Sequence, residues 1–142
     1  VGLDPIATQD FYRRIEQLKE QGCTVILCSH VLPGVEKYID RALILGRGKL
    51  LAEGSVNDLR QQADLPATFH LQGDLTLPDH LAARANRDGD STRLDVALQD
   101  KMSTMQQLVA LPGLENVDIH LPSLEDLYTH FIESHQMQEA TP

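Results

Sequence analysis

The chain has 142 residues, of which 42% are hydrophobic and 4% aromatic, so it can bury a mainly aliphatic core and is not disordered. Its formal net charge of −9 lies in the second half: residues 1–60 hold eight acidic and eight basic side chains, residues 61–142 hold 13 and four. This acidity argues against nucleic acid or an anionic membrane surface as a partner, although it can also serve solubility alone.

Two cysteines, Cys23 and Cys28, are too few for a disulfide scaffold and fit no zinc spacing. We therefore expect a reducing, cytoplasmic compartment. Apolar runs such as residues 42–45 are too short to span a bilayer. The change in charge near residue 60 predicts a domain boundary there, which divides the chain into residues 1–62 and 63–142.

The first predicted helix begins at Asp4-Pro5, an N-cap acceptor followed by proline at the first helical position. An apolar stripe containing Phe11, Ile15 and Leu18 predicts that the helix continues to Gly22. Residues 24–28 are continuously apolar and partly β-branched. This pattern predicts a strand that is covered on both faces, as in a parallel sheet.

A short helix is predicted over residues 32–38, followed by two strands over residues 41–45 and 49–53. Gly46-Arg47-Gly48 between these strands predicts a tight hairpin turn. Ser55 with Asp58 three residues later resembles a capping box, which predicts a helix to about Gln62.

The second half alternates helical and strand patterns. We predict strands over residues 68–72, 92–98 and 117–121, and helices over residues 79–86 and 101–111. The last helix follows Ser123, because apolar residues recur there at i, i+3, i+4, i+7 and i+8. This order predicts a small α+β or α/β accessory domain with one sheet face covered by helices.

His30 is the first candidate for chemistry, because it follows the predicted strand at the end where open α/β sheets bind ligands. On position alone, an ordinary loop histidine is the simpler interpretation. Asp4 has a similar alternative, since it can be a helix cap and nothing more.

Taken together, these segments resemble the ATP-binding subunit of ABC transporters. The resemblance rests on Gly2-Leu3-Asp4-Pro5, on the run from Thr24 to His30, and on the later runs DRALIL, GK and EGS, all in the same order as in that family. It covers residues 1–62. It implies that the fold is the C-terminal half of a P-loop ATPase core and that the Walker A loop, the signature motif and the Walker B acid lie upstream.

The resemblance also implies roles for single residues. Gly2, Leu3 and Asp4 form the D-loop, which lies at the nucleotide site and the dimer interface, with Asp4 acting across to a second ATPase subunit. His30 is the catalytic switch histidine that contacts the γ-phosphate. ATP and Mg²⁺ are then the cofactors, bound mainly by upstream residues, and these 142 residues are inactive alone. A membrane permease is the other partner, which places the protein on the inner face of the cell membrane.

A finer resemblance rests on residues 28–36, CSHVLPGVE, and residues 122–128, PSLEDLY. Both are similar to the ABC ATPases that serve nitrous oxide reductase maturation. This resemblance extends over nearly the whole chain and implies a role in energising a permease that supports copper-site assembly.

The sequence predicts no metal site. Five of the six histidines and all three methionines lie in the second half, but no two histidines have metal-ligand spacing. Met102 and Met105 are spaced for one helix face, which is also an ordinary core pattern.

Two other classes of protein remain as alternatives. The chain can be a stand-alone acidic α/β module that binds a protein without nucleotide chemistry. It can also be a small enzyme that uses His30 with a carboxylate, although the sequence suggests no nucleophile–base pair.

Overall fold

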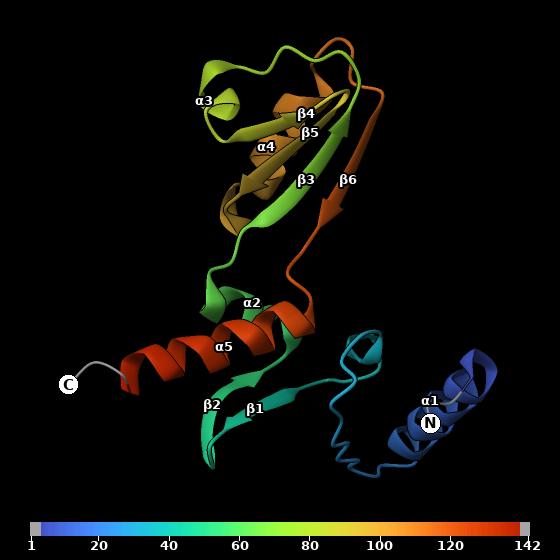
Figure 1. The fold of residues 1–142 in the computed structure, drawn as a ribbon. Helices are drawn as coiled ribbons and strands as arrows, with labels where there is room; N and C mark the ends of the chain where they lie inside the picture. The colour runs from blue at the N-terminus through green and yellow to red at the C-terminus, as the bar shows by residue number, and fades with distance from the viewer. Residues whose placement is uncertain (1–3, 140–142) are drawn as a thin grey trace. The chain divides into compact units, whose positions relative to one another are not determined.

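The computed structural model describes residues 4–139, with side chains to residue 137. The chain forms two compact units, Val1–Asp40 and Arg41–Pro142, and each is described separately below. The fold is mixed α/β, as the sequence predicts, and both of its sheets are antiparallel (Figure 1).

The first unit contains α1 (Pro5–Glu20) and the short 3₁₀ helix η1 (Val35–Lys37). Two contacts join α1 to the residues after η1. The rings of Tyr12 and Tyr38 stack with centroids 4.0 Å apart, and Lys19 Nζ lies 2.8 Å from Asp40 Oδ2. An aromatic stack and an ion pair therefore fix the helix against the end of this unit.

The predicted strand over residues 24–28 is wrong for this structure. These residues form no helix or strand, and every one of them is exposed. A strand covered on both faces needs neighbouring strands, and the described residues contain no parallel sheet to supply them. The helix α1 likewise has no sheet to pack on in this unit, and it buries none of its residues. Its apolar Phe11 and Leu18 are 40% and 44% exposed. The helix predicted over residues 32–38 shrinks to η1.

The second unit begins with the hairpin of β1 (Ala42–Gly46) and β2 (Lys49–Gly54). Arg47 and Gly48 form its two-residue turn with φ angles of 49° and 78°, and two positive φ angles are what a type I′ turn requires. The predicted hairpin turn is confirmed.

A capping box begins α2 (Val56–Ala63). Ser55 Oγ accepts a hydrogen bond from the Asp58 N–H at 3.1 Å, and Asp58 Oδ2 accepts one from the Ser55 N–H at 2.9 Å. The Ser55 hydroxyl also donates to Asp58 Oδ2 at 2.7 Å. The box confirms the predicted helix start and fixes the chain direction after the hairpin.

A four-stranded sheet follows. It is built from β3 (Ala67–Gln72), β4 (Ala85–Asp88), β5 (Ser91–Val96) and β6 (Asn116–His120), with α3 (Asp79–Ala82) between β3 and β4, and η2 (Leu98–Asp100) and α4 (Lys101–Val109) between β5 and β6. The strand order is β4-β5-β3-β6, and all neighbours are antiparallel. This βαββαβ order with β3 and β5 in the centre is the ferredoxin-like topology.

The predicted helix over residues 79–86 is therefore wrong in its second half. The helix ends at Ala82, and Ala85–Asp88 pair with β5 as an edge strand. The predicted strands over residues 68–72 and 117–121 agree with β3 and β6 to within one residue at each end.

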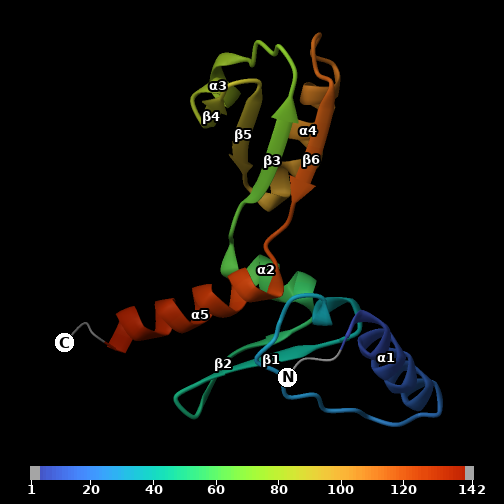
Figure 2. The same cartoon turned by 45° about the vertical axis from the view of Figure 1, so that its right-hand side comes forward.

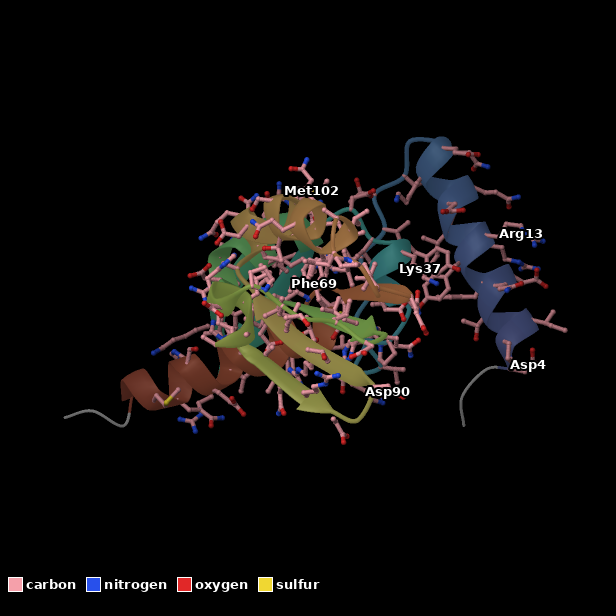
Figure 3. All side chains as sticks on the ribbon, turned by 90° about the horizontal axis from the view of Figure 1, so that it is seen from above. Asp4, Arg13, Lys37, Phe69, Asp90 and Met102 are labelled. Atoms are coloured by element: carbon pink, nitrogen blue, oxygen red, sulfur yellow. The ribbon has the colours of Figure 1, made fainter. Side chains whose placement is uncertain are left out.

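One face of this sheet carries the hydrophobic core. Phe69 and Leu71 of β3 and Leu94 of β5 are completely buried there, together with Leu108 of α4. Figures 1 and 2 show α4 lying behind the sheet, and Figure 3 shows Phe69 inside and Met102 on the outer side of α4. Met102 is 63% exposed, so the Met102 and Met105 spacing does not make a continuous core stripe.

The opposite face of the sheet is entirely polar. Strand alternation places on it Thr68, His70, Gln72, Asn86, Asp88, Ser91, Arg93, Asp95, Asn116, Asp118 and His120. Apart from Thr68 and His70, which are half-buried, these residues are exposed. Helices thus cover one face of this sheet, as predicted, and leave the other to solvent among the described residues.

The last helix, α5 (Leu124–Glu139), returns to the hairpin and α2. Its Leu124 and Leu127 are buried, and Arg60 Nε of α2 donates to the Pro122 carbonyl at 2.7 Å just before α5 begins. The hairpin, α2, the four-stranded sheet and α5 all lie in the second unit. The predicted boundary between residues 62 and 63 stays a prediction.

Replacing Leu108 with Ala should lower the free energy of unfolding by about 2–5 kcal/mol, because it opens a cavity in a completely buried site. The next residue supplies a matched control: Val109 is 60% exposed, and Val109→Ala should change stability by no more than about 0.5 kcal/mol. Urea unfolding measures both. Equal losses in the two variants would contradict the assigned core face.

The capping box should make stability depend on pH. The hydrogen bonds from the Ser55 side chain and backbone lower the pKa of Asp58 from its usual 3.8. The folded state therefore gains stability from Asp58 above pH 3.8, and this gain is lost as the pH falls through the lowered pKa. Asp58→Asn should be less stable than the parent at neutral pH, and the difference should close well below pH 3.8 in unfolding measured across pH. If the parent stays more stable than Asp58→Asn in acid, the ionised Asp58 carboxylate is not what stabilises the capping box.

Candidate functional site

Asp4 is positioned by the start of α1. Its Oδ1 accepts a hydrogen bond from the Ala7 N–H at 2.8 Å, and its carbonyl accepts from the Thr8 N–H at 2.9 Å. Pro5 follows at the first helical position. Asp4 is therefore a helix N-cap, as predicted. Gly2 and Leu3, the other two residues of the predicted D-loop, lie outside the described residues.

The Asp4 side chain is exposed (Figure 3), as are those of Pro5 and Ile6. A cap uses one carboxylate oxygen, and Oδ1 takes that role here. Oδ2 can accept further hydrogen bonds from a second molecule, because a carboxylate has about four lone-pair sites. Capping and contact with another subunit are thus chemically compatible.

His30 lies in the irregular segment between α1 and η1, and its side chain is exposed. The residue before it makes a small local turn: Ser29 Oγ accepts from the Val31 N–H at 3.0 Å, and the Ser29 hydroxyl donates to the Val31 carbonyl at 2.9 Å. This turn fixes the backbone on either side of His30. The imidazole is accessible to a phosphate group, for which it can act as a hydrogen-bond donor.

The described residues do not assemble Asp4 and His30 into one site. No hydrogen bond or ion pair joins them, and none gives His30 a carboxylate partner among residues 4–139. The small-enzyme alternative needs such a partner, so this geometry does not favour it. The same part of the chain contains no group of three or more His, Cys, Asp or Glu side chains that could hold a metal ion.

Sequence reasoning missed one pair of side chains. The spacing of His70 and His120 in the sequence predicts no contact between them, yet their rings lie edge to face with centroids 5.0 Å apart on the polar face of the sheet. The signal was the register of β3 against β6, which pairs His70 with Asp118 and Thr68 with His120. Strand alternation alone could have placed the two rings on one face, but the pairing of the two strands could not be known.

The polar face also has two shallow hollows, each of about 500 Å³. One is lined by acidic residues at the strand ends, including Asp74, Asp88 and Asp90, and the other by His70, Asn86 and Arg93 among others. Both lie in the second unit, whereas Asp4 and His30 belong to the first.

Comparison with known proteins relates this chain to ATP-binding proteins of ABC transporters. It is 35% identical over 65 residues to the uncharacterised ABC transporter ATP-binding protein YthP of Bacillus subtilis, covering 46% of this chain and 28% of YthP. It is 36% identical over 62 residues to the ABC-type transporter ATP-binding protein EcsA of the same organism, covering 44% of this chain and 25% of EcsA. The ABC transporter protein AbcA of Aeromonas salmonicida is 29% identical over 108 residues, 76% of this chain and 33% of AbcA.

The chain thus spans a third or less of the length of these relatives. No family model matches it. Among the described residues, no helix has the length and apolar character needed to cross a membrane.

The capping role of Asp4 predicts a difference between two substitutions. Asp4→Ala removes the acceptor and should weaken the start of α1 by about 1 kcal/mol, whereas Asp4→Asn keeps a capping oxygen. Hydrogen exchange at the Ala7 amide should therefore quicken about five-fold in Asp4→Ala and little in Asp4→Asn. If both variants exchange equally fast, the side-chain cap does not hold this helix.

Proposed function

We propose that this chain forms part of the ATP-binding subunit of an ABC transporter, a subunit that hydrolyses ATP to energise a membrane permease. The similarity to YthP, EcsA and AbcA supports this most directly. The first 62 residues contribute the D-loop, Gly2-Leu3-Asp4, and the switch histidine, His30.

In this proposal the exposed imidazole of His30 contacts the bound nucleotide. An imidazole N–H donates a hydrogen bond to the γ-phosphate of ATP, and the bond is lost when that phosphate leaves. The hydrogen bonds between Ser29 and Val31 restrict the backbone around His30, and this limits the positions that the imidazole can take. His30 therefore reports whether the nucleotide is intact.

Asp4 works at the boundary with a second subunit. One carboxylate oxygen caps α1, and the other contacts the facing nucleotide site in trans. Two ATPase subunits then enclose two nucleotides between them. Because the same carboxylate caps α1, a displacement of Asp4 at the subunit interface also displaces the start of this helix.

ATP and Mg²⁺ need further groups. The 142 residues contain no Walker A loop, no signature motif and no Walker B acid. A Gly-rich loop and its lysine bind the phosphates in such ATPases, and acidic and hydroxyl side chains hold the magnesium ion. The chain by itself therefore neither binds ATP tightly nor hydrolyses it.

The exposed apolar side chains of the first unit support a place within a larger core. Val25, Ile26 and Leu27 are 37%, 86% and 37% exposed, although their sequence is typical of a buried strand. In the proposed subunit they pair with parallel strands of the ATPase core. The apolar stripe of α1, which contains Phe11 and Leu18, then packs against the same sheet.

The finer assignment within this class is to NosF, the ATPase of the transporter that serves nitrous oxide reductase maturation. The runs CSHVLPGVE and PSLEDLY support it. In that role the subunit lies on the cytoplasmic face of the membrane and energises a permease that supports copper-site assembly. The acidic second unit then regulates or stabilises the ATPase dimer.

The other candidate function is a stand-alone acidic protein-interaction module, which the polar face of the four-stranded sheet favours.

The switch assignment is tested in a subunit that carries this sequence together with a Walker A loop and a Walker B acid. His30→Ala should leave ATP binding nearly unchanged and lower ATP hydrolysis on the order of 10²-fold, because a donor to the transferred phosphate is removed. Nucleotide binding and phosphate release are measured on the same sample.

His80→Ala is the matched control, since His80 is an exposed histidine whose Nε2 lies 2.9 Å from Gln107 Oε1, in the second unit. This variant should hydrolyse ATP at the parent rate. Parent-like hydrolysis by His30→Ala would show that His30 is an ordinary loop histidine.

A further inference from the structure

The four-stranded sheet has two edges, and the chain protects them differently. The β4 edge is four residues long and carries charge at Arg87 and Asp88, with Arg87 Nη2 3.6 Å from Asp74 Oδ1. Short, charged edges resist pairing with another strand. The β6 edge has five residues, no lysine, no proline and no break in its pairing with β3. Within the described structure, β6 pairs only with β3.

The side chains of β6 alternate in a way that limits how it could pair with itself. Ile119 is 37% exposed and lies opposite Phe69, on the helix-covered side. Asp118 and His120 lie on the polar face, opposite His70 and Thr68. In an antiparallel pair, residues directly opposite each other point to the same face of the sheet. A two-fold axis therefore keeps the helix-covered faces of both copies on one side only if one residue lies opposite its own copy at the axis.

Two registers of this kind, with the axis at Asp118 or at Ile119, pair most residues of β6 with the other copy. An axis at Asp118 places two aspartates directly opposite each other, which is unfavourable. An axis at Ile119 places Asp118 of each copy opposite His120 of the other, and this arrangement brings together a carboxylate acceptor and an imidazole donor twice. It also places Ile119 opposite Ile119, and Val117 opposite Leu121. The sequence of β6 is therefore complementary to itself in this second register.

We propose that two copies of this chain associate through antiparallel β6 strands around a two-fold axis at Ile119, with reciprocal Asp118–His120 contacts. The pairing joins two four-stranded sheets into one continuous sheet. The helices of both copies lie on one side, and the polar faces join on the other. The proposal rests on the second unit alone and does not depend on nucleotide binding.

Neighbouring contacts prepare both side chains for this role. Asn116 Nδ2 donates to Asp118 Oδ2 at 3.3 Å, and the His120 ring rests edge to face against His70. Each contact restricts the side chain before association, which lowers the entropy lost when the partner arrives.

Cysteine crosslinking captures this small interface. In a Cys23→Ser, Cys28→Ser background, Ile119→Cys places two thiols directly opposite across the axis, where Cβ atoms are about 5 Å apart. Glu115→Cys is the matched control, because Glu115 is exposed directly before β6 and its two copies are eight positions apart, about 26 Å. With oxidised glutathione, Ile119→Cys should form at least about ten-fold more covalent dimer than Glu115→Cys. Equal yields at the two positions would overturn the register.

Charge exchange tests the reciprocal contacts in the Ile119→Cys background. Asp118→His places two histidines opposite each other, and His120→Asp places two aspartates opposite each other, so each should lower the dimer yield. The double variant Asp118→His, His120→Asp restores opposite partners and should recover the yield. Circular dichroism verifies that each variant is folded. A double variant that crosslinks no better than either single variant would show that these contacts do not hold two copies together.

Discussion

A β-strand is stable only where a neighbour satisfies its backbone N–H and C=O groups, and this requirement organises the whole molecule. In the second unit every strand has an antiparallel neighbour, and β3 has one on each side. Its Phe69 and Leu71 can therefore be completely buried beneath α4. In the first unit the strand-like residues 24–28 have no such neighbour, and Val35 is the sole hydrophobic residue buried among residues 4–40.

The same requirement explains the candidate site. His30 follows a segment whose regular structure depends on strands that the described residues do not supply. Asp4 is held locally by its cap. In the proposed ATPase subunit, the functional partners of both residues lie on other parts of the nucleotide site. The chain therefore presents two accessible groups, and the chemistry proposed for them needs a phosphate-binding loop and a magnesium site contributed by other residues.

Local signals were sufficient to predict part of the structure. The Arg47-Gly48 turn and the Ser55–Asp58 box depend on adjacent residues, and both are confirmed. Non-local pairing was not predictable in the same way. Ala85 and Asn86 belong to the predicted helix over residues 79–86, yet they form a strand because β5 lies beside them. The His70–His120 contact likewise depends on the register of two strands whose paired residues are 44 or more positions apart in the chain, which no spacing in the sequence reveals. The cap at Asp4 was predictable from the sequence, whereas the role proposed for His30 rests on the resemblance.

The coding sequence directly upstream of Val1, together with the intact mass of the native protein, tests the central claim most directly. The account predicts a longer chain whose preceding residues contain a Gly-rich loop with Lys-Ser/Thr, a signature motif and a strand that ends in an acidic residue. A native chain that starts at Val1, or a preceding sequence without these elements, would contradict the assignment of Asp4 and His30 to an ATPase and would favour the interaction module.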